Sequence, residues 1–359
     1  MERTPSETTP PQEGVMETPP AATPFRGIPA PTGRRTTRRE ALAALGLLGL
    51  SLPFIACGGA QRPDLPSLPG HATGTQEGGP LPLFSFGVLA DVQYADAPPV
   101  GTRFYRNSLG KLERCVADLN ARNLAFTIQL GDLIDKDFAG FDKLLPIYER
   151  LKTTRHHVLG NHDYAVGDTP KQAVPAKLGL KAAYYDFARK GWRFIVLDGG
   201  EVSTFANPPG SERHRRAQET LASLREKGAP NAQDWNGTVS PAQITWLKAK
   251  LDAAARNSEN VLVFCHFPIY PQRAENLWDD KMLSELLESH PCVKAYLAGH
   301  NHAGEYAEHN GLHYLTFKGM VETEDTTAYA VLDVYPDRLK VTGFGRESSR
   351  DLLLRRGTR

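Results

Sequence analysis

The sequence predicts an α/β fold in which two packed sheets are flanked by helices. Apolar runs of strand length alternate with helical patterns from residue 83 onward. After residue 302 only strand-like runs follow, an order that suits two sheets packed face to face. Short polar clusters come directly after several of the predicted strands. These clusters indicate a site on loops at the strand ends.

The predicted strands are short apolar runs. Five of them belong to the alternating part of the chain: Leu83–Leu89, Leu124–Leu130, Trp192–Leu197, Val261–Phe264 and Val293–Leu297. Such near-continuous apolar character is typical of strands that are buried on both faces. Three further runs, rich in β-branched and aromatic residues, come later: Leu312–Phe317, Ala328–Tyr335 and Leu339–Phe344.

Two helices are indicated by apolar spacing and by capping residues. The first carries an apolar stripe with intervals of 3, 4 and 3 residues: Leu109, Leu112, Val116 and Leu119. The second is predicted to begin at Ser240-Pro241, because serine caps free backbone N–H groups and proline suits the first turn. Its stripe continues through Ile244, Leu247 and Leu251.

One catalytic domain is predicted over residues 83–350, followed by a basic C-terminal tail at 351–359. Within it, residues 199–239 form a variable polar insertion with a predicted helix from Ser211 to Lys227. Insertions of this length are usually functional or disordered, and a lid over the substrate is one use that fits.

The first 82 residues are predicted to lie outside the folded domain. Residues 1–33 are rich in Pro, Thr and Glu without an apolar period, which is typical of disorder. Residues 34–57 combine paired arginines with an apolar run and Cys57, a pattern typical of a Tat-type export signal. The run would rise about 24 Å as a helix, short of the roughly 30 Å hydrocarbon core. Residues 58–82, rich in Pro and Gly, are predicted to be a flexible linker.

The expected location is outside the cytoplasm of a bacterium, either periplasmic or anchored to a membrane. The segment Phe54-Ile55-Ala56-Cys57 resembles a bacterial lipobox, so lipid attachment at Cys57 and simple cleavage both stay open. Cys115, Cys265 and Cys292 lie in apolar patterns and are expected to be free thiols. A formal net charge of +1 gives no reason to expect nucleic acid or a membrane surface as partner. The oligomeric state cannot be predicted.

Five polar clusters follow predicted strands: Asp91-Val92-Gln93, Gly131-Asp132 with Asp135, Gly160-Asn161-His162-Asp163, Cys265-His266 and Gly299-His300-Asn301-His302. A single aspartate or asparagine after a strand is usually a turn or cap residue. The ordered set, however, gathers oxygen and nitrogen ligands where loops from several strands converge. This pattern favours two adjacent metal ions and a dinuclear metallohydrolase.

The order and spacing of these clusters resemble the calcineurin-like metallophosphoesterase superfamily. The resemblance implies a four-layer α/β/β/α metallophosphoesterase sandwich with a dinuclear metal site on loops at strand ends. Gln93 stands where most of the superfamily has histidine. Gln93, the segment 101–109, Asn236-Gly237 and Val321-Glu322-Thr323 together look like the manganese-dependent ADP-ribose/CDP-alcohol diphosphatase family.

The resemblance implies seven metal ligands and a metal-bridging hydroxide that attacks phosphorus. One ion would be held by Asp91, Gln93, Asp132 and His302, and the other by Asp132, Asn161, His266 and His300. Asp132 would bridge them, because its two oxygens can serve both ions. Oxygen and nitrogen ligands without cysteine suit Mn²⁺ or Fe better than a thiolate-rich zinc site. The family implies two Mn²⁺ ions, while Fe or Zn stays open.

Further residues receive roles from the same resemblance or from their position in the sequence. His162 looks like the general acid that protonates the leaving oxygen, oriented by Asp135. Arg106 and Arg103 come shortly after the first cluster and are expected to bind a second substrate phosphate, because a guanidinium fork matches phosphate geometry. The alternative for both is a solvated helix start. Asp163 is interpreted as a solvated residue, with a second orienting group as the alternative.

The expected activity is metal-dependent hydrolysis of phosphoanhydride bonds in nucleotide diphosphate compounds, such as ADP-ribose or CDP-alcohols. The alternative is a phosphodiesterase or phosphomonoesterase of the same superfamily, acting on cyclic nucleotides or phospholipid headgroups. A non-catalytic exported binding protein is a third interpretation, which the complete ligand set and His162 disfavour.

Overall fold

The computed structural model describes residues 80–355 of the 359-residue chain. The predicted N-terminal extension (1–33), the export signal (34–57) with Cys57 and most of the predicted linker (58–82) lie outside the described residues. Residues 356–359 of the predicted tail lie outside them as well. Within residues 80–355, no helix is both long and apolar enough to cross a membrane.

Sheet 1 combines the first strands of the domain with the last. Its order is β14-β13-β12-β1-β2-β3, in which β1, β2 and β3 are parallel and the other pairings are antiparallel. Its strands are β1 (Phe84–Leu89), β2 (Phe126–Gln129), β3 (Thr154–His157), β12 (Ala328–Val334), β13 (Arg338–Gly345) and β14 (Arg350–Leu353).

Sheet 2 has the order β10-β11-β9-β8-β5-β4, with antiparallel pairs only at its two edges. Its strands are β4 (Tyr185–Arg189), β5 (Trp192–Val196), β8 (Asn260–Phe264), β9 (Val293–Ala298), β10 (Glu305–His309) and β11 (Leu312–Thr316). A separate two-stranded pair joins β6 (Val202–Ser203) to β7 (Gly237–Thr238).

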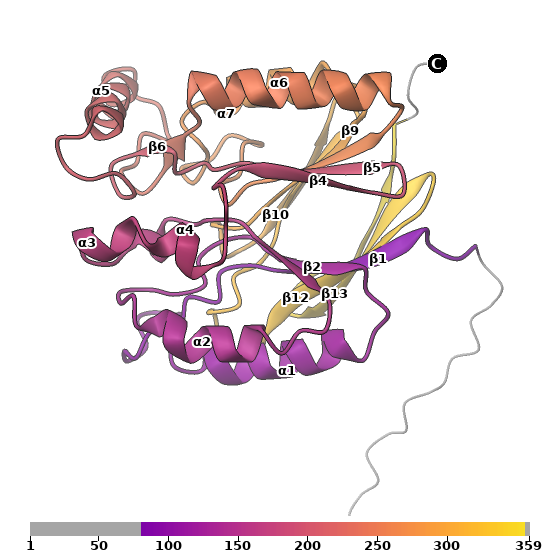
Figure 1. The fold of residues 1–359 in the computed structure, drawn as a ribbon, viewed down its shortest axis with the longest axis horizontal. Coiled ribbons are helices and arrows are strands. Elements are labelled where there is room, and N and C mark those ends of the chain that lie inside the picture. Colours follow the sequence, from indigo (N-terminus) through magenta and orange to yellow (C-terminus); the bar gives the residue numbers. More distant parts are fainter. Residues whose placement is uncertain (1–79, 356–359) are drawn as a thin grey trace, which may run out of the picture. The chain divides into compact units, whose positions relative to one another are not determined.

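The helices cover the outer faces of the two sheets (Figure 1). α1 (Ser108–Asn120) and α2 (Gly140–Tyr148) pack on sheet 1, and α6 (Pro241–Arg256) and α7 (Asp280–Glu288) pack on sheet 2. A central core with stacked and edge-on rings of Phe86, Phe126 and Phe194 fills the space between the sheets. The predicted four-layer α/β/β/α sandwich is therefore confirmed.

The predicted elements are found close to their expected bounds. The apolar stripe of α1 is buried at Leu112, Val116 and Leu119. At the start of α6, Oγ of Ser240 accepts the backbone N–H of Gln243. The domain boundary needs a correction, because β14 pairs with β13 and buries Leu352, so residues 351–353 belong to the sheet and not to a tail.

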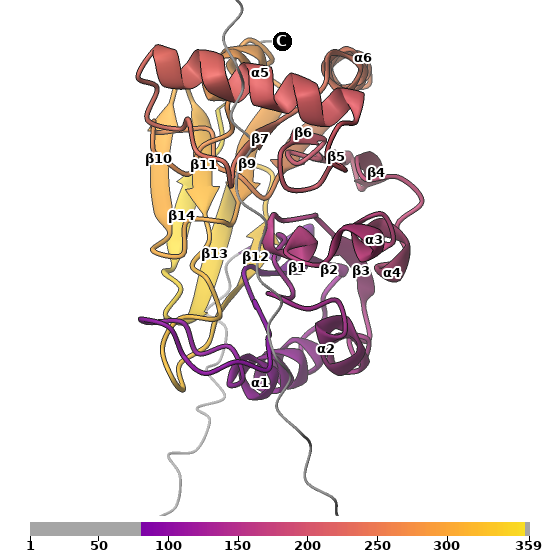
Figure 2. The ribbon, with the colours of Figure 1, turned by 90° about the vertical axis from the view of Figure 1, so that its left-hand side faces the viewer.

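The insertion at 199–239 is folded and carries α5 (Glu212–Glu226) at one side of sheet 2 (Figure 2). Oγ of Ser211 caps this helix, as the sequence predicts. Val202, Ala217, Leu221 and Trp278 form a small core of their own beneath it. Short helices α3 (Asp168–Lys171) and α4 (Val174–Lys177) and a 3₁₀ turn at His162–Tyr164 complete the fold.

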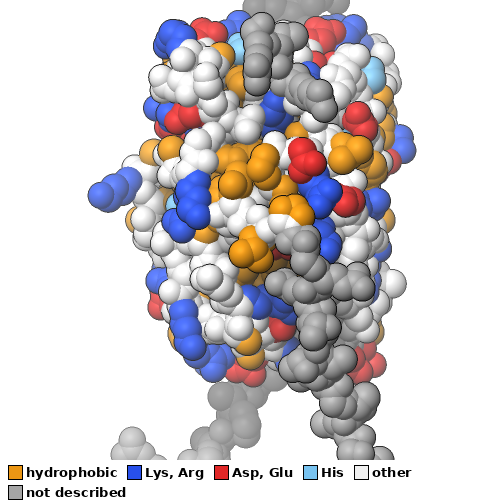
Figure 3. Space-filling model, turned by 90° about the vertical axis from the view of Figure 1, so that its right-hand side faces the viewer, with side chains coloured by type: hydrophobic (Ala, Val, Ile, Leu, Met, Phe, Trp, Pro, Cys, Tyr) orange, Lys and Arg blue, Asp and Glu red, His pale blue; other side chains and the backbone are white. Residues whose placement is uncertain are grey.

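The end of the domain at which β1 begins has a mixed surface. Figure 3 shows basic, acidic and hydrophobic side chains interspersed on this face. This mixture agrees with the small formal net charge of the chain.

Candidate metal centre

The predicted ligands all follow the carboxyl ends of parallel strands. They come from five loops: Asp91 and Gln93 after β1, Asp132 after β2, Asn161 after β3, His266 after β8, and His300 and His302 after β9. Since these strands end at the same edge of their sheets, the loops converge there. The structure thus brings all seven side chains together, and Asp91, Gln93, Asp132 and His266 are fully buried.

Four of the seven residues have backbone angles that L-amino acids rarely adopt. The φ angle is +52° at Asp91, +44° at Gln93, +57° at Asp132 and +68° at His300. A residue held in such a region costs about 1–3 kcal/mol and persists only where its surroundings fix it. Four of the nine non-glycine residues with positive φ in the described part of the chain are therefore predicted ligands.

One half of the site gathers Asp91, Gln93 and His302. Nε2 of His302 lies 3.4 Å from Oδ1 of Asp91 and 3.2 Å from Nε2 of Gln93. The same amide nitrogen lies 3.1 Å from Oδ2 of Asp132. Oε1 of Gln93 is buried and has no hydrogen-bond partner in the described part of the chain. A half-turn of the amide exchanges these two atoms and presents the oxygen to the cluster.

The other half gathers Asn161, His266 and His300 around Asp132. Nε2 of His266 lies 3.2 Å from Oδ2 of Asp132, 3.1 Å from Oδ1 of Asn161 and 3.1 Å from Nδ1 of His300. Oδ1 of Asp132 accepts the backbone N–H of His162 at 2.7 Å. The two oxygens of Asp132 thus have different surroundings: Oδ1 accepts a backbone hydrogen bond, and Oδ2 faces both halves of the site.

Each of the three histidines is held from behind by an oxygen acceptor. Nδ1 of His266 donates to the carbonyl of Leu130 at 2.7 Å, and Nδ1 of His302 donates to Glu322 at 2.7 Å. Nε2 of His300 faces Oδ1 of Asn236, whose own amide nitrogen donates to two carbonyls. With one ring nitrogen protonated in each case, the other turns a lone pair toward the cluster.

This arrangement fits a cation. The atoms that meet at 3.1 to 3.4 Å are carboxylate, amide and imidazole groups, and the tautomers leave the imidazoles as acceptors. Acceptors crowded so closely repel one another unless a positive charge lies between them, either a metal ion or the ring protons of His266 and His302. Sequence reasoning did not assign Glu322 or Asn236 to the site. Their only signal was their place in segments that resemble the diphosphatase family.

The electrostatics of the site favour positive charge. Burial lowers the pKa of His266, but the carboxylate of Asp132 more than offsets this and raises it to about 9. The pKa of His302 is likewise raised to about 9 by Asp91 and Glu322 against the effect of burial. The hydrogen bond from His302 lowers the pKa of Glu322 to about 2. A bound metal would compete with these protons, so metal affinity falls at low pH.

His162 and Asp135 lie together beside the cluster, as the sequence predicts. Nδ1 of His162 is 3.0 Å from Oδ1 of Asp135. Burial lowers the pKa of His162, but Asp132 and Asp135 outweigh burial and leave the pKa above its usual value. The ring lines the same pocket as Gln93, Asn161 and His302.

The two arginines separate in the structure. Arg103 lines the pocket of the predicted ligands and lies 3.8 Å from Glu322. Arg106 does not line this pocket, and its Nε instead donates to Asp96 at 2.5 Å on the surface. The structure therefore places Arg103 at this pocket and Arg106 outside its lining, and substrate binding by Arg106 stays a prediction.

Asp163 also differs from its interpretation as a solvated residue. It is fully buried, and its carboxylate accepts backbone N–H groups of Asp132, Leu133 and Gly160 at 2.8 to 3.0 Å. It therefore ties the loop after β2 to the loop after β3.

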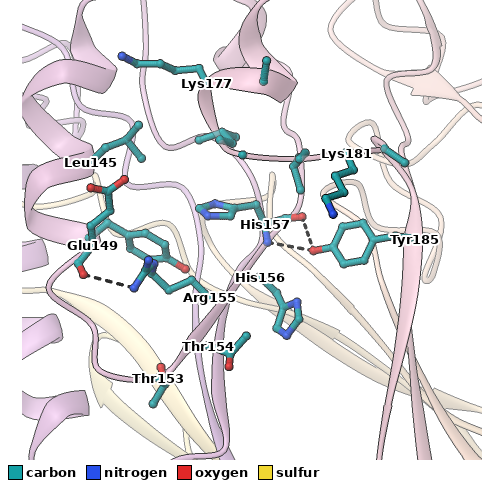
Figure 4. A pocket seen from close by; sticks show the side chains of 16 residues that line it. Leu145, Glu149, Thr153, Thr154, Arg155, His156, His157, Lys177, Lys181 and Tyr185 are labelled. Carbon is teal, nitrogen blue, oxygen red and sulfur yellow. Dashed lines mark hydrogen bonds between the residues drawn. The ribbon is translucent and has the colours of Figure 1, made fainter.

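A larger hollow of about 770 Å³ lies beside β3 and β4 (Figure 4). None of the seven predicted ligands lines it. Its polar groups are largely paired within the protein. The hydroxyl of Tyr185 bonds both the N–H and the carbonyl of His157, Arg155 donates to the carbonyls of Glu149 and Leu151, and Lys177 pairs with Asp142. Size alone does not make this hollow the better candidate.

A model of the family described as calcineurin-like phosphoesterase matches residues 84–304. The matched segment contains all seven predicted ligands together with His162 and Asp135. The chain belongs to the calcineurin-like phosphoesterase family. The fold and the resemblance that the sequence predicts are thereby confirmed, and this phosphoesterase is a metal-dependent hydrolase.

Known relatives of this phosphoesterase are similar over most of their length. A manganese-dependent ADP-ribose/CDP-alcohol diphosphatase from Xenopus tropicalis is 30% identical, covering 76% of this chain and 95% of the relative. The protein of the same name from Oryza sativa subsp. japonica is 32% identical, covering 73% and 91%. The crystal structure of a dimetal phosphatase from Danio rerio has a TM-score of 0.69 and 26% identity, covering 76% of this chain and all of that one.

Proposed function

We propose that this phosphoesterase binds two divalent metal ions, Mn²⁺ foremost, and hydrolyses phosphoanhydrides of nucleotide diphosphate compounds such as ADP-ribose or CDP-alcohols. One observation carries the proposal. A single pocket of about 530 Å³ is lined by predicted ligands and also by Arg103 and His162. A metal cluster, a proton donor and a guanidinium in one pocket match a substrate with two phosphates. The names of the relatives support the same substrate class.

The charges of the ligands suit an anionic substrate. Asp91 and Asp132 are the only charged side chains among the seven proposed ligands, so they neutralise half the charge of two divalent ions. When bound, the metal ions would supply an attacking water of lowered pKa and offset charge on the phosphoryl oxygens. The remaining positive charge attracts phosphate into the pocket.

The other residues divide the remaining tasks. His162, oriented by Asp135, protonates the leaving oxygen. Arg103 binds the phosphate that is not attacked. Trp235, 45% exposed at the pocket and supplied by the insertion, offers a flat aromatic surface against which a base can lie.

The proposal is tested by a hydrolysis panel with Mn²⁺ across ADP-ribose, CDP-choline, CDP-glycerol, cyclic nucleotides and an aryl phosphate diester. We expect the diphosphate compounds to have the highest kcat/KM and to yield a nucleoside monophosphate. A preference for cyclic nucleotides or for the aryl diester would support the phosphodiesterase alternative instead.

Changing Arg103 to alanine should selectively impair diphosphate substrates. A charge-assisted hydrogen bond contributes about 1.5–3 kcal/mol, so kcat/KM for ADP-ribose or a CDP-alcohol should fall on the order of 10- to 100-fold. The aryl diester, with a single phosphorus, should change little. Arg106→Ala is the matched control and should leave both substrates unaffected, because Arg106 pairs with Asp96 outside the pocket. Equal losses on both substrates in Arg103→Ala would show that this residue does not act through the second phosphate.

Changing Gln93 to histidine should shift metal preference toward Zn²⁺ or Fe, because imidazole is a softer donor than an amide oxygen. The measurement is activity and metal content after reconstitution with each metal in turn. An unchanged metal profile would show that the amide is not a ligand.

We further propose that the chain is exported, on the strength of the paired arginines, the apolar run and Cys57 in residues 34–57. Fractionation of cells that express the full chain tests this. Recovery in the cytoplasm alone would contradict export, and a Cys57→Ala variant released from a membrane fraction would indicate lipid attachment.

A further inference from the structure

A fully buried lysine occupies the inner face of α1. Lys111 has no exposed surface and lies on the same side of the helix as Leu112 and Cys115, which belong to the core. Lysine is rarely buried completely unless its ammonium group is satisfied. Burial lowers the pKa of Lys111 to about 8, so the side chain is still mainly protonated at pH 7. A helix that only packed against the sheet would carry an apolar residue here.

The ammonium group of Lys111 collects the carbonyls of three consecutive residues. Its Nζ donates to the carbonyl oxygens of Val321 at 3.0 Å, Glu322 at 3.3 Å and Thr323 at 2.9 Å. Among the residues that the structure describes, no carboxylate lies within ion-pair distance of this nitrogen. Three carbonyl dipoles aimed at one point repel each other unless a cation holds them. The positive φ of Thr323, +63°, is part of this turn.

The segment held in this way runs along the candidate metal centre. The N–H of Val321 donates to the carbonyl of Asp91 at 2.9 Å, and the side chain of Glu322 accepts from Nδ1 of His302 at 2.7 Å. A short antiparallel bridge links Arg103 with Glu322. The segment therefore contacts two proposed ligands of one metal ion and the arginine of the pocket.

We infer that Lys111 is a positioning residue that shapes the metal site of Asp91, Gln93 and His302 by holding the segment 321–323. The inference rests on the proposed function, because it takes these three residues to be metal ligands. Without the ammonium group the carbonyls separate, Glu322 moves relative to His302, and the imidazole loses its fixed orientation. The site of His266 and His300 has its own supports, Leu130 and Asn236, and is left intact.

The experiment is a titration of the purified full chain with Mn²⁺ by equilibrium dialysis and elemental analysis. We expect wild type to bind two ions and Lys111→Met to weaken one of them by about 10-fold, the lower end of the effect of losing a group bonded directly to a metal ligand, because Lys111 acts through Glu322. The other ion should bind as in wild type. Arg114→Met is the matched control, because this basic residue of the same helix donates to the carbonyl of Asp325, outside the segment. It should bind both ions normally.

A double-mutant cycle separates positioning from general damage. If Lys111 acts through Glu322, the variant Glu322→Gln should weaken the same ion, and Lys111→Met combined with Glu322→Gln should lie within about twofold of Glu322→Gln alone. Multiplying losses would overturn the inference, as would normal Mn²⁺ binding by Lys111→Met. If Lys111→Met does not fold, Lys111→Gln replaces it under the same criteria. A wild-type chain that binds fewer than two ions would overturn the proposed function and this inference together.

Discussion

Replacing Asp132 with alanine is expected to abolish hydrolysis and to reduce bound metal from two ions to one or none. Oδ2 of this residue faces both halves of the cluster, 3.1 Å from the Gln93 amide and 3.2 Å from Nε2 of His266. Two unit charges about 4 Å apart repel by about 4 kcal/mol at an effective dielectric constant of 20. Two divalent ions at about that separation repel roughly four times as strongly, about 16 kcal/mol, before their ligands offset it.

Loss of the Asp132 carboxylate would therefore remove the group that offsets the repulsion between the two proposed ions. Activity on ADP-ribose and metal content after dialysis are the measurements. Asp142→Ala is a suitable control, since that carboxylate lies on the surface and pairs with Lys177. Near wild-type turnover in Asp132→Ala, with Asp142→Ala unchanged, would contradict a dinuclear site.

The parts of the site that sequence could predict are those fixed by local order along the chain. A strand precedes each of the ligand loops, and the parallel strands of a sheet end at a common edge. These loops carry Asp91, Asp132, Asn161, His266, and His300 with His302. Their convergence is thus a consequence of topology, and topology followed from the alternation of apolar runs and helical stripes. The same logic recovered α1 and α6, where spacing and capping agree.

The parts that sequence could not predict depend on pairings between distant segments. Arg103 and Arg106 are three residues apart in an irregular stretch, where neither a helical nor a strand period says which one points inward. The bridge from Arg103 to Glu322, more than two hundred residues away, decides it. Lys111 and the segment 321–323 are separated in the same way.

The sequence also failed to predict the burial of some polar segments. Asp163 follows a glycine and two polar residues, which favours solvent exposure. The loops after β2 and β3 nevertheless bury it, and backbone N–H groups of both loops donate to its carboxylate. The strand β14 was not predicted from the sequence, because the arginines on either side of it resemble a charged tail. Its pairing with β13 becomes visible only when sheet 1 is assembled.

Replacing His162 with alanine should leave both metals bound while kcat falls by roughly 10²–10⁴, the range for loss of a positioned proton donor. The imidazole lies in the pocket and is not one of the seven proposed ligands. The fall should be largest for substrates with poor leaving groups. An activated aryl ester, whose leaving oxygen needs little protonation, should lose much less.

Comparison of the two substrate types distinguishes the roles open to this histidine. Asp135→Asn should reproduce part of the loss, because its carboxylate lies 3.0 Å from Nδ1 of His162 and is placed to orient the ring. Equal losses on both substrates in His162→Ala would point to binding of the phosphoryl oxygens instead of proton transfer. Since the backbone N–H of residue 162, and not its side chain, holds Oδ1 of Asp132, the metal content should stay at the wild-type value in either case. Unchanged kcat on both substrates would remove His162 from the mechanism.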